Sequence, residues 1–91
     1  MMNFQEVEEG NGLMVNGVIY HVGDCVKIIG KHDWGSNIET VIGYIQSWDL
    51  EDAPAWDTHA GICIKSLYNS YDYPNMTLET MVSISRWEVK R

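Results

Sequence analysis

Residues 20–28 decide the fold class, and they read Tyr20-His21-Val22-Gly23-Asp24-Cys25-Val26-Lys27-Ile28. Gly23-Asp24 is a typical turn pair, because both residue types tolerate the backbone angles of tight turns. The residues after it alternate in polarity: Val26 and Ile28 share one face, and Lys27 lies on the other. Alternation with period two is the signature of a strand with one buried face. The stretch therefore predicts a tight turn that leads into a core strand.

Similar strand signals occur on both sides of this stretch. Residues 18–20 are β-branched and aromatic, residues 38–48 form one long strand candidate, and residues 61–65 and 81–85 alternate again. Gly43 interrupts the long candidate, which predicts a bulge or a sharp bend. We expect an all-β domain of about five antiparallel strands. Its predicted core consists of Val26, Ile28, Val41 or Ile42, Ile45, Ile62, Ile64, Val82 and Ile84.

The rest of the chain is predicted to be turns, loops and an N-terminal extension. Asn16-Gly17 is a strong hairpin signal between residues 13–15 and 18–20. Residues 1–16 are expected to be an acidic lead-in, and residues 17–91 the folded domain. Residues 49–59 predict an acidic loop, and residues 69–78 a second long loop that is rich in tyrosine. Residues 77–81 favour at most one helical turn.

The stretch 20–28, followed by Val41-Ile42-Gly43-Tyr44-Ile45, resembles the opening of small SH3-like barrels of the KOW, Tudor and BAH type. The resemblance covers roughly residues 18–89 and implies a small antiparallel barrel whose mid-strand glycine lets the sheet bend. It implies no activity, because this fold hosts many unrelated functions. The long acidic loop departs from Tudor domains. The absence of a basic cluster near Gly43 departs from KOW domains and argues against RNA binding.

The composition narrows the classes of partner. The 91 residues include 13 acids and 6 bases, which gives a formal net charge of −7. Proteins that bind the DNA or RNA backbone need a basic face, and so do proteins that adsorb to anionic lipid. We therefore expect no direct binding to duplex DNA and no membrane association. Neither a signal-peptide pattern nor a membrane-length apolar run is visible, so we expect a cytoplasmic protein.

The acidic loop is the leading candidate for a binding site. Four carboxylates and an aromatic anchor occur within nine positions, and a basic partner would be attracted to the carboxylates. The alternative is a solvated loop that only keeps the protein soluble. The predicted partner-binding residues are Asp49, Glu51, Asp52, Trp56 and Asp57. Further aromatic candidates are Trp34, Tyr68, Tyr71 and Tyr73, which either form a cage for a methylated ammonium group or pack over their loops.

Catalytic chemistry is not indicated. The acids near His59 lack the spacing of an EF-hand loop, and neither a nucleophile elbow nor a phosphate-binding glycine loop occurs. Cys25 and Cys63 are not in a CxxC arrangement, and we expect two reduced thiols that pack as small hydrophobes. The sequence therefore predicts no enzyme activity, no cofactor and no metal.

Three hypotheses about function follow. The leading one is a protein–protein interaction module that acts as an adaptor or inhibitor and binds a basic surface of a nucleic-acid-handling protein. In its extreme form the carboxylates mimic DNA phosphates, and in size and charge the chain is similar to phage-encoded proteins that redirect host machinery. The second hypothesis is a peptide reader of the Tudor type. The third is nucleic-acid binding through a local basic patch of Lys27, Lys31, Lys65 and the C-terminal tail. Open sheet edges also allow a homodimer.

Overall fold

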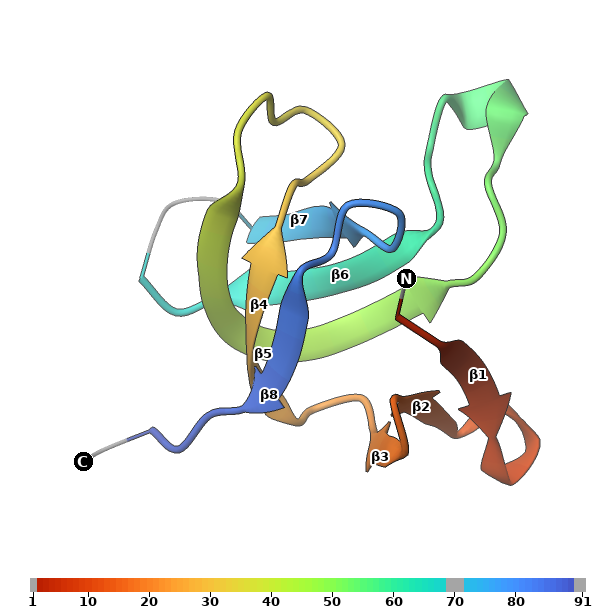
Figure 1. Cartoon of the computed structure of the whole chain (residues 1–91), viewed down its shortest axis with the longest axis vertical. Coiled ribbons are helices and arrows are strands. Elements are labelled where there is room, and N and C mark those ends of the chain that lie inside the picture. The colour runs from red at the N-terminus through yellow and green to blue at the C-terminus, as the bar shows by residue number, and fades with distance from the viewer. Residues whose placement is uncertain (1, 69–71, 90–91) are drawn as a thin grey trace.

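The computed structural model describes residues 2–68 and 72–89, with Trp56, Asp72 and Tyr73 described by their backbone alone (Figure 1). This part of the chain contains strands and two short 3₁₀ turns but no α-helix, which confirms the all-β prediction. The turns are η1 (Glu8–Gly10) and η2 (Pro54–Trp56). The strands are β1 (Phe4–Val7), β2 (Gly12–Val15), β3 (Val18–Tyr20), β4 (Cys25–Gly30), β5 (Glu39–Asp49), β6 (Gly61–Ser66), β7 (Asp72–Thr77) and β8 (Ser83–Arg86).

The strands form two antiparallel sheets. The smaller sheet has the order β1-β2-β3, and the larger one has the order β7-β6-β5-β4-β8. Neighbouring strands of the larger sheet are consecutive in sequence, except that β8 returns to pair with β4. The larger sheet is open rather than a closed barrel, because β7 and β8 are its edges.

The smaller sheet is built around the hairpin that Asn16-Gly17 predicted. Both turn residues have positive φ values, 50° and 87°, as a two-residue hairpin turn requires. Val15 pairs with Val18 on one side of the hairpin, and Phe4 pairs with Val15 on the other side. Residues 4–15, which were expected to belong to a lead-in, thus form two strands of a sheet.

Gly43 lets the central strand bend. A Cβ atom at this position would lie 2.1 Å from the carbonyl oxygen of Lys65, so no other residue fits without a shift of the backbone. The register between β5 and β6 also shifts between Ile45 and Ser47. Together these irregularities accompany the strong curvature of β5 in Figure 1, as the interior glycine predicted.

This curvature brings the end of β4 around to β7. The backbone nitrogen of Asp33 donates to the carbonyl oxygen of Asn75 at 3.1 Å, and that of Thr77 donates to Lys31 at 2.9 Å. His32 and Met76 form an isolated β-bridge between these bonds. Residues that are more than 40 positions apart therefore meet at one end of the sheet.

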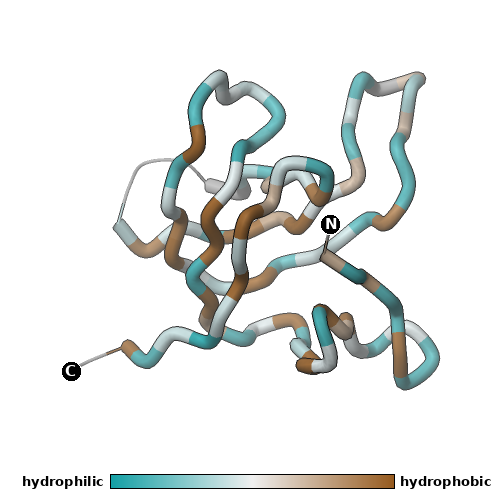
Figure 2. Tube along the Cα trace, in the orientation of Figure 1, coloured by the Kyte–Doolittle hydropathy of each residue, from teal (hydrophilic) through white to brown (hydrophobic). Residues whose placement is uncertain are grey.

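The core lies between the curved sheet and the hairpin. Hydrophobic residues recur along the strands in Figure 2, whereas the two long loops are mainly hydrophilic. Six predicted core positions are buried: Val26, Ile28, Val41, Ile45, Ile62 and Ile64. The core also contains Leu13, Val15, Tyr20, Met76 and Met81, which were not predicted.

The predicted strand over residues 81–85 is wrong in its first half. Val82, expected in the core, is 57% exposed, and Met81 is buried instead. The nitrogen of Met81 donates to the carbonyl oxygen of Leu78, which closes a turn over residues 78–80 and directs Met81 inward. The strand begins only at Ser83, and Ile84 is partly buried against the core.

The prediction of a long loop over residues 69–78 is also wrong where it covers β7. This stretch contains Pro74, which has no N–H group to donate to a neighbouring strand. In the structure Pro74 lies on an edge strand at the register shift between Cys63 and Lys65 of β6, where the missing donor interrupts little pairing.

Candidate functional site

Two loops meet at the end of the larger sheet where Lys31–Asp33 contacts β7. The loop between β4 and β5 covers residues 31–38, and the loop between β5 and β6 covers residues 50–60. Both rise on the same side of the molecule in Figure 1. We call this part of the surface the acidic end. It contains the predicted residues Asp49, Glu51, Asp52 and Asp57, all of them exposed, together with Trp34.

A small polar network joins the two loops. The carboxylate of Asp33 lies 3.1 Å from Nδ1 of His59 and accepts a 2.7 Å hydrogen bond from Nδ2 of Asn75. The same Asn75 amide donates to the carbonyl oxygen of His59 at 2.9 Å. The Asp33 side chain is only 12% exposed, so its carboxylate belongs to the framework of this end rather than to its free surface.

Trp34 projects from this framework and is 93% exposed. It lines a small cleft with Asp33, Asp57, Thr58 and His59. An exposed tryptophan beside carboxylates is typical of an interaction surface, because aromatic side chains supply much of the energy at interfaces. The sequence named Trp34 only as a secondary candidate, since nothing in the sequence showed that its loop lies beside the acidic one.

Two of the four predicted carboxylates also shape their own loop. Asp49 accepts from the backbone nitrogen of Glu51 at 3.2 Å, and Asp52 accepts from that of Ala60 at 2.8 Å. Within the described residues, the carboxylates of Glu51 and Asp57 make no hydrogen bond or ion pair. They are therefore the freest negative charges of the loop.

Tyr68, a further predicted aromatic residue, is not brought to this end. Tyr68 is 69% exposed and follows the C-terminal end of β6, whereas the acidic loop enters the opposite end of that strand. The side chains of Trp56 and Tyr73, and the whole of Tyr71, lie outside the described residues. Among the described side chains, Trp34 and Tyr68 thus do not share a cage.

Two lysines of the proposed nucleic-acid patch lie on different strands, and Lys90 and Arg91 of its C-terminal tail lie outside the described residues. The Lys27 ammonium lies 5.8 Å from the centre of the Trp87 ring, and Lys65 lies on β6, with β5 between them. Arg86 forms an ion pair with Asp24 at 3.0 Å and stacks 5.0 Å from the Tyr20 ring. It thereby joins the smaller sheet to the larger one.

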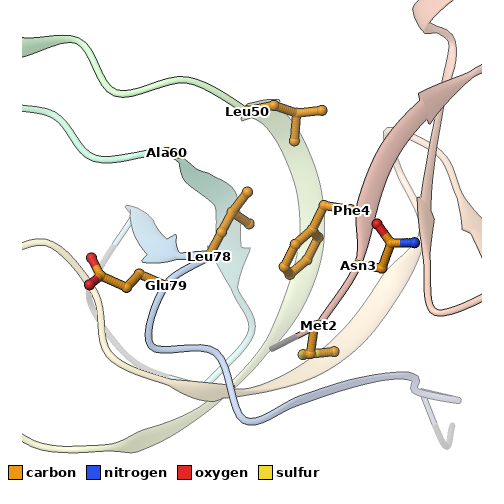
Figure 3. A pocket seen from close by; sticks show the side chains of 7 residues that line it. All are labelled: Met2, Asn3, Phe4, Leu50, Ala60, Leu78 and Glu79. Atoms are coloured by element: carbon orange, nitrogen blue, oxygen red, sulfur yellow. The ribbon is translucent and has the colours of Figure 1, made fainter.

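A second cleft, of about 390 Å³, opens between the two sheets near the acidic loop. Met2 and Phe4 lie on one side, Leu50, Ala60 and Leu78 lie on the other, and Glu79 is at the rim. Figure 3 shows the side chains of Phe4 and Leu78 pointing toward each other across it. Sequence reasoning missed this cleft because it assigned residues 1–16 to a lead-in outside the domain.

Among the described residues, no set of three or more His, Cys, Asp or Glu side chains could hold a metal ion. Cys25 and Cys63 are unpaired thiols, and burial raises the pKa of Cys25 above its ordinary value. The Sγ atom of Cys63 lies 3.6 Å from Oδ1 of Asn75.

No helix in the described part of the chain is long and apolar enough to cross a membrane.

Comparison with protein-family models, with curated proteins and with solved structures gave no match for this chain.

Proposed function

We propose that the protein is a non-enzymatic interaction module whose acidic end binds a basic surface of another protein. The observation that carries this proposal is the exposure of Trp34 in a cleft that it shares with the exposed acid Asp57. Three further exposed acids, Asp49, Glu51 and Asp52, lie in or next to the same loop as Asp57. The Asp33–His59–Asn75 network holds the two loops together, so that little ordering is needed when a partner binds. The net charge of −7 would speed the encounter with a basic partner.

The partner class in this proposal is a nucleic-acid-handling protein, for which the module would be an adaptor or an inhibitor. Carboxylates in a basic groove can replace phosphates as ion-pair partners, and a phage-encoded, cytoplasmic protein that mimics DNA would work in this way. The proposal includes an SH3-like framework for residues 18–89. The bend at Gly43 and the return of β8 to β4 support that assignment.

The test is affinity capture from a cell lysate with four immobilised proteins, followed by mass spectrometry. Three of them are the parent, Trp34→Ala, and a triple variant in which Asp49, Glu51 and Asp52 become Asn, Gln and Asn. These amides keep an acceptor oxygen for the loop's own hydrogen bonds. Glu88→Gln, at an exposed acid outside the acidic end, is the control.

We expect a basic protein that the parent and the control retain and that both acidic-end variants lose. Retention of the same proteins by all four would refute the proposal. If the protein bound duplex DNA directly, a gel-shift assay with purified protein would show binding that weakens with increasing salt. We do not expect such binding.

A further inference from the structure

The cleft between the two sheets leaves apolar surface uncovered. Met2, Phe4, Leu50 and Leu78 pack against the core, but each is only partly buried. The other two residues of the lining are the polar Asn3 and Glu79. In Figure 3 the Glu79 carboxylate points away from the apolar side chains, so the cleft is mainly apolar and has a charged group at its rim. Apolar patches with polar rims are typical of sites where another protein docks.

The position of the cleft connects it to the acidic end. Leu50 and Ala60 are the first and last residues of the loop between β5 and β6, so these two cleft residues lie where the acidic loop begins and ends. The backbone confirms the closeness: Ala60 donates to Asp52, and its carbonyl oxygen accepts from Leu78 at 2.9 Å. A ligand in the cleft therefore lies at the base of the loop.

Glu79 also lines a neighbouring polar cleft, which contains Asp33, His59 and Lys31. Glu79 is thus common to the linings of both clefts, and Asp33 and His59 of the polar cleft also lie beside Trp34. Glu79 is exposed, whereas the Asp33 carboxylate is held by His59 and Asn75, so Glu79 is the acid of these two clefts that a cation of a partner can approach. A partner segment with a positive charge on either side of an apolar group would complement an apolar cleft that has acidic residues around it.

We propose that the cleft receives one apolar side chain of a partner segment in which lysine or arginine residues flank that side chain. This inference rests on the proposed function and specifies the chemistry of the partner. The apolar side chain would fill the space between Phe4 and Leu78. The flanking cations would lie over Glu79 and over the acidic loop, where Glu51 and Asp57 are free to pair with them.

The test uses two fluorescein-labelled synthetic peptides in anisotropy titrations at low and at physiological salt. Both are lysine-rich and have the same charge, but one has a central leucine where the other has serine. The protein variants are Ala60→Met, which fills the cleft with a longer side chain, and Glu79→Lys, which reverses the charge at the rim. Glu88→Lys serves as the matched charge control, and thermal unfolding by circular dichroism confirms that each variant is folded.

We expect the parent to bind the leucine peptide about tenfold more tightly than the serine peptide, because burial of a leucine is worth at least that factor. Ala60→Met should abolish this preference, and Glu79→Lys should weaken both peptides more than Glu88→Lys does. Equal binding of both peptides would leave the proposed function standing and overturn the inference. Failure of both to bind would count against the two proposals together. A dimer in sedimentation velocity that Ala60→Met dissociates would assign the cleft to a second copy and also overturn the inference.

Discussion

Asp33 and His59, 26 positions apart in the sequence, are joined by a 3.1 Å contact between carboxylate and imidazole. The two residues differ in burial: the Asp33 side chain is 12% exposed and that of His59 is 57% exposed. Asn75 contacts both of them, through its amide donors, from the edge strand β7. The loops that carry Trp34 and the acidic residues are thus fixed to each other and to the sheet.

The unequal burial predicts unequal effects of substitution. Asp33→Ala should lower the free energy of unfolding by about 1–3 kcal/mol, since it leaves the Asn75 amide with one partner fewer in a partly buried place. His59→Ala should change it by less than about 1 kcal/mol, because exposed ion pairs contribute little. Urea unfolding of both variants gives the comparison, with Asp33→Asn, which retains an acceptor, as the control. Equal losses for Asp33→Ala and His59→Ala would contradict this account of the network.

A second prediction separates the aromatic anchor from the charges at the acidic end. Trp34→Ala should leave the free energy of unfolding within about 0.5 kcal/mol of the parent, because the side chain is almost fully exposed. Its effect should appear as a faster off-rate from the captured partner, worth about 2 kcal/mol if Trp34 is a hot spot. Trp56→Ala is expected to act in the same direction.

The charge variant should behave differently in the same kinetic measurement. Conversion of Asp49, Glu51 and Asp52 to their amides should mainly slow association and flatten its dependence on salt. Surface plasmon resonance at low and high salt resolves both rates. Unchanged rates in the tryptophan and amide variants would exclude the acidic end and direct attention to Glu6–Glu9 or Tyr68.

The bend in β5 gives a third prediction. Gly43→Ala would place a methyl group against the Lys65 carbonyl oxygen, and the backbone would have to separate β5 from β6. We expect a loss of about 3 kcal/mol, at the upper end of what overpacking usually costs. Ser47→Ala, at an exposed position of the same strand, should stay within about 0.5 kcal/mol of the parent. A Gly43→Ala protein that unfolds at the parent's denaturant concentration would show that the bend does not depend on glycine.

Local patterns predicted the parts of this fold that depend on neighbouring residues. The hairpin at Asn16-Gly17, the turn at Gly23-Asp24 and the alternation around Val26 and Ile28 each follow from a few adjacent residues, and the structure has all of them. The bend at Gly43 belongs to the same group, because only a residue without a Cβ fits so close to another strand.

The errors arose where distant segments decide the outcome. Leu13 and Val15 lie in a segment preceded by acids and glycines, and only the packing of the hairpin against the larger sheet shows that they are core residues. Residues 72–77 were expected to be a loop, but they pair with β6, and the edge position tolerates Pro74. The proximity of Trp34 to the acidic loop depends on the curvature of β5. A local sequence pattern predicts that this strand bends, but it does not predict the direction of the bend.

The complete burial of Ile64 predicts that the core does not tolerate a charged residue at this position. Its side chain is fully buried on β6, opposite Ile45 of β5. Ile64→Asp should unfold the domain at room temperature, because an unpaired buried charge costs several kcal/mol, on the order of the whole stability of a small domain. Ile64→Val is the control, and it should cost only about 1 kcal/mol. A folded circular dichroism and NMR signature for Ile64→Asp would place residue 64 outside the core.

The last prediction concerns alkaline pH. Burial raises the pKa of the Tyr20 phenol above its ordinary value of 10.0; the Arg86 cation opposes this shift and the Asp24 carboxylate adds to it. Burial likewise raises the pKa of the Cys25 thiol above 9.0. For both groups the folded state holds its proton more tightly than the unfolded state does. As pH rises past 9 the unfolded chain loses these protons first, so the free energy of unfolding must fall with increasing pH.

Substitution of Tyr20 and Cys25 should reduce the loss of unfolding free energy that the parent shows as pH rises. We expect a Tyr20→Phe, Cys25→Ala protein to lose less stability than the parent between about pH 9 and pH 11, whatever its stability at pH 7. Arg86→Gln should raise the Tyr20 pKa further, because the cation that favours the phenolate is removed. Urea unfolding across this pH range measures the first effect, and a spectrophotometric titration of phenolate absorbance measures the second. If the free energy of unfolding falls equally steeply with pH in the parent and in the double variant, then other groups cause the loss of stability.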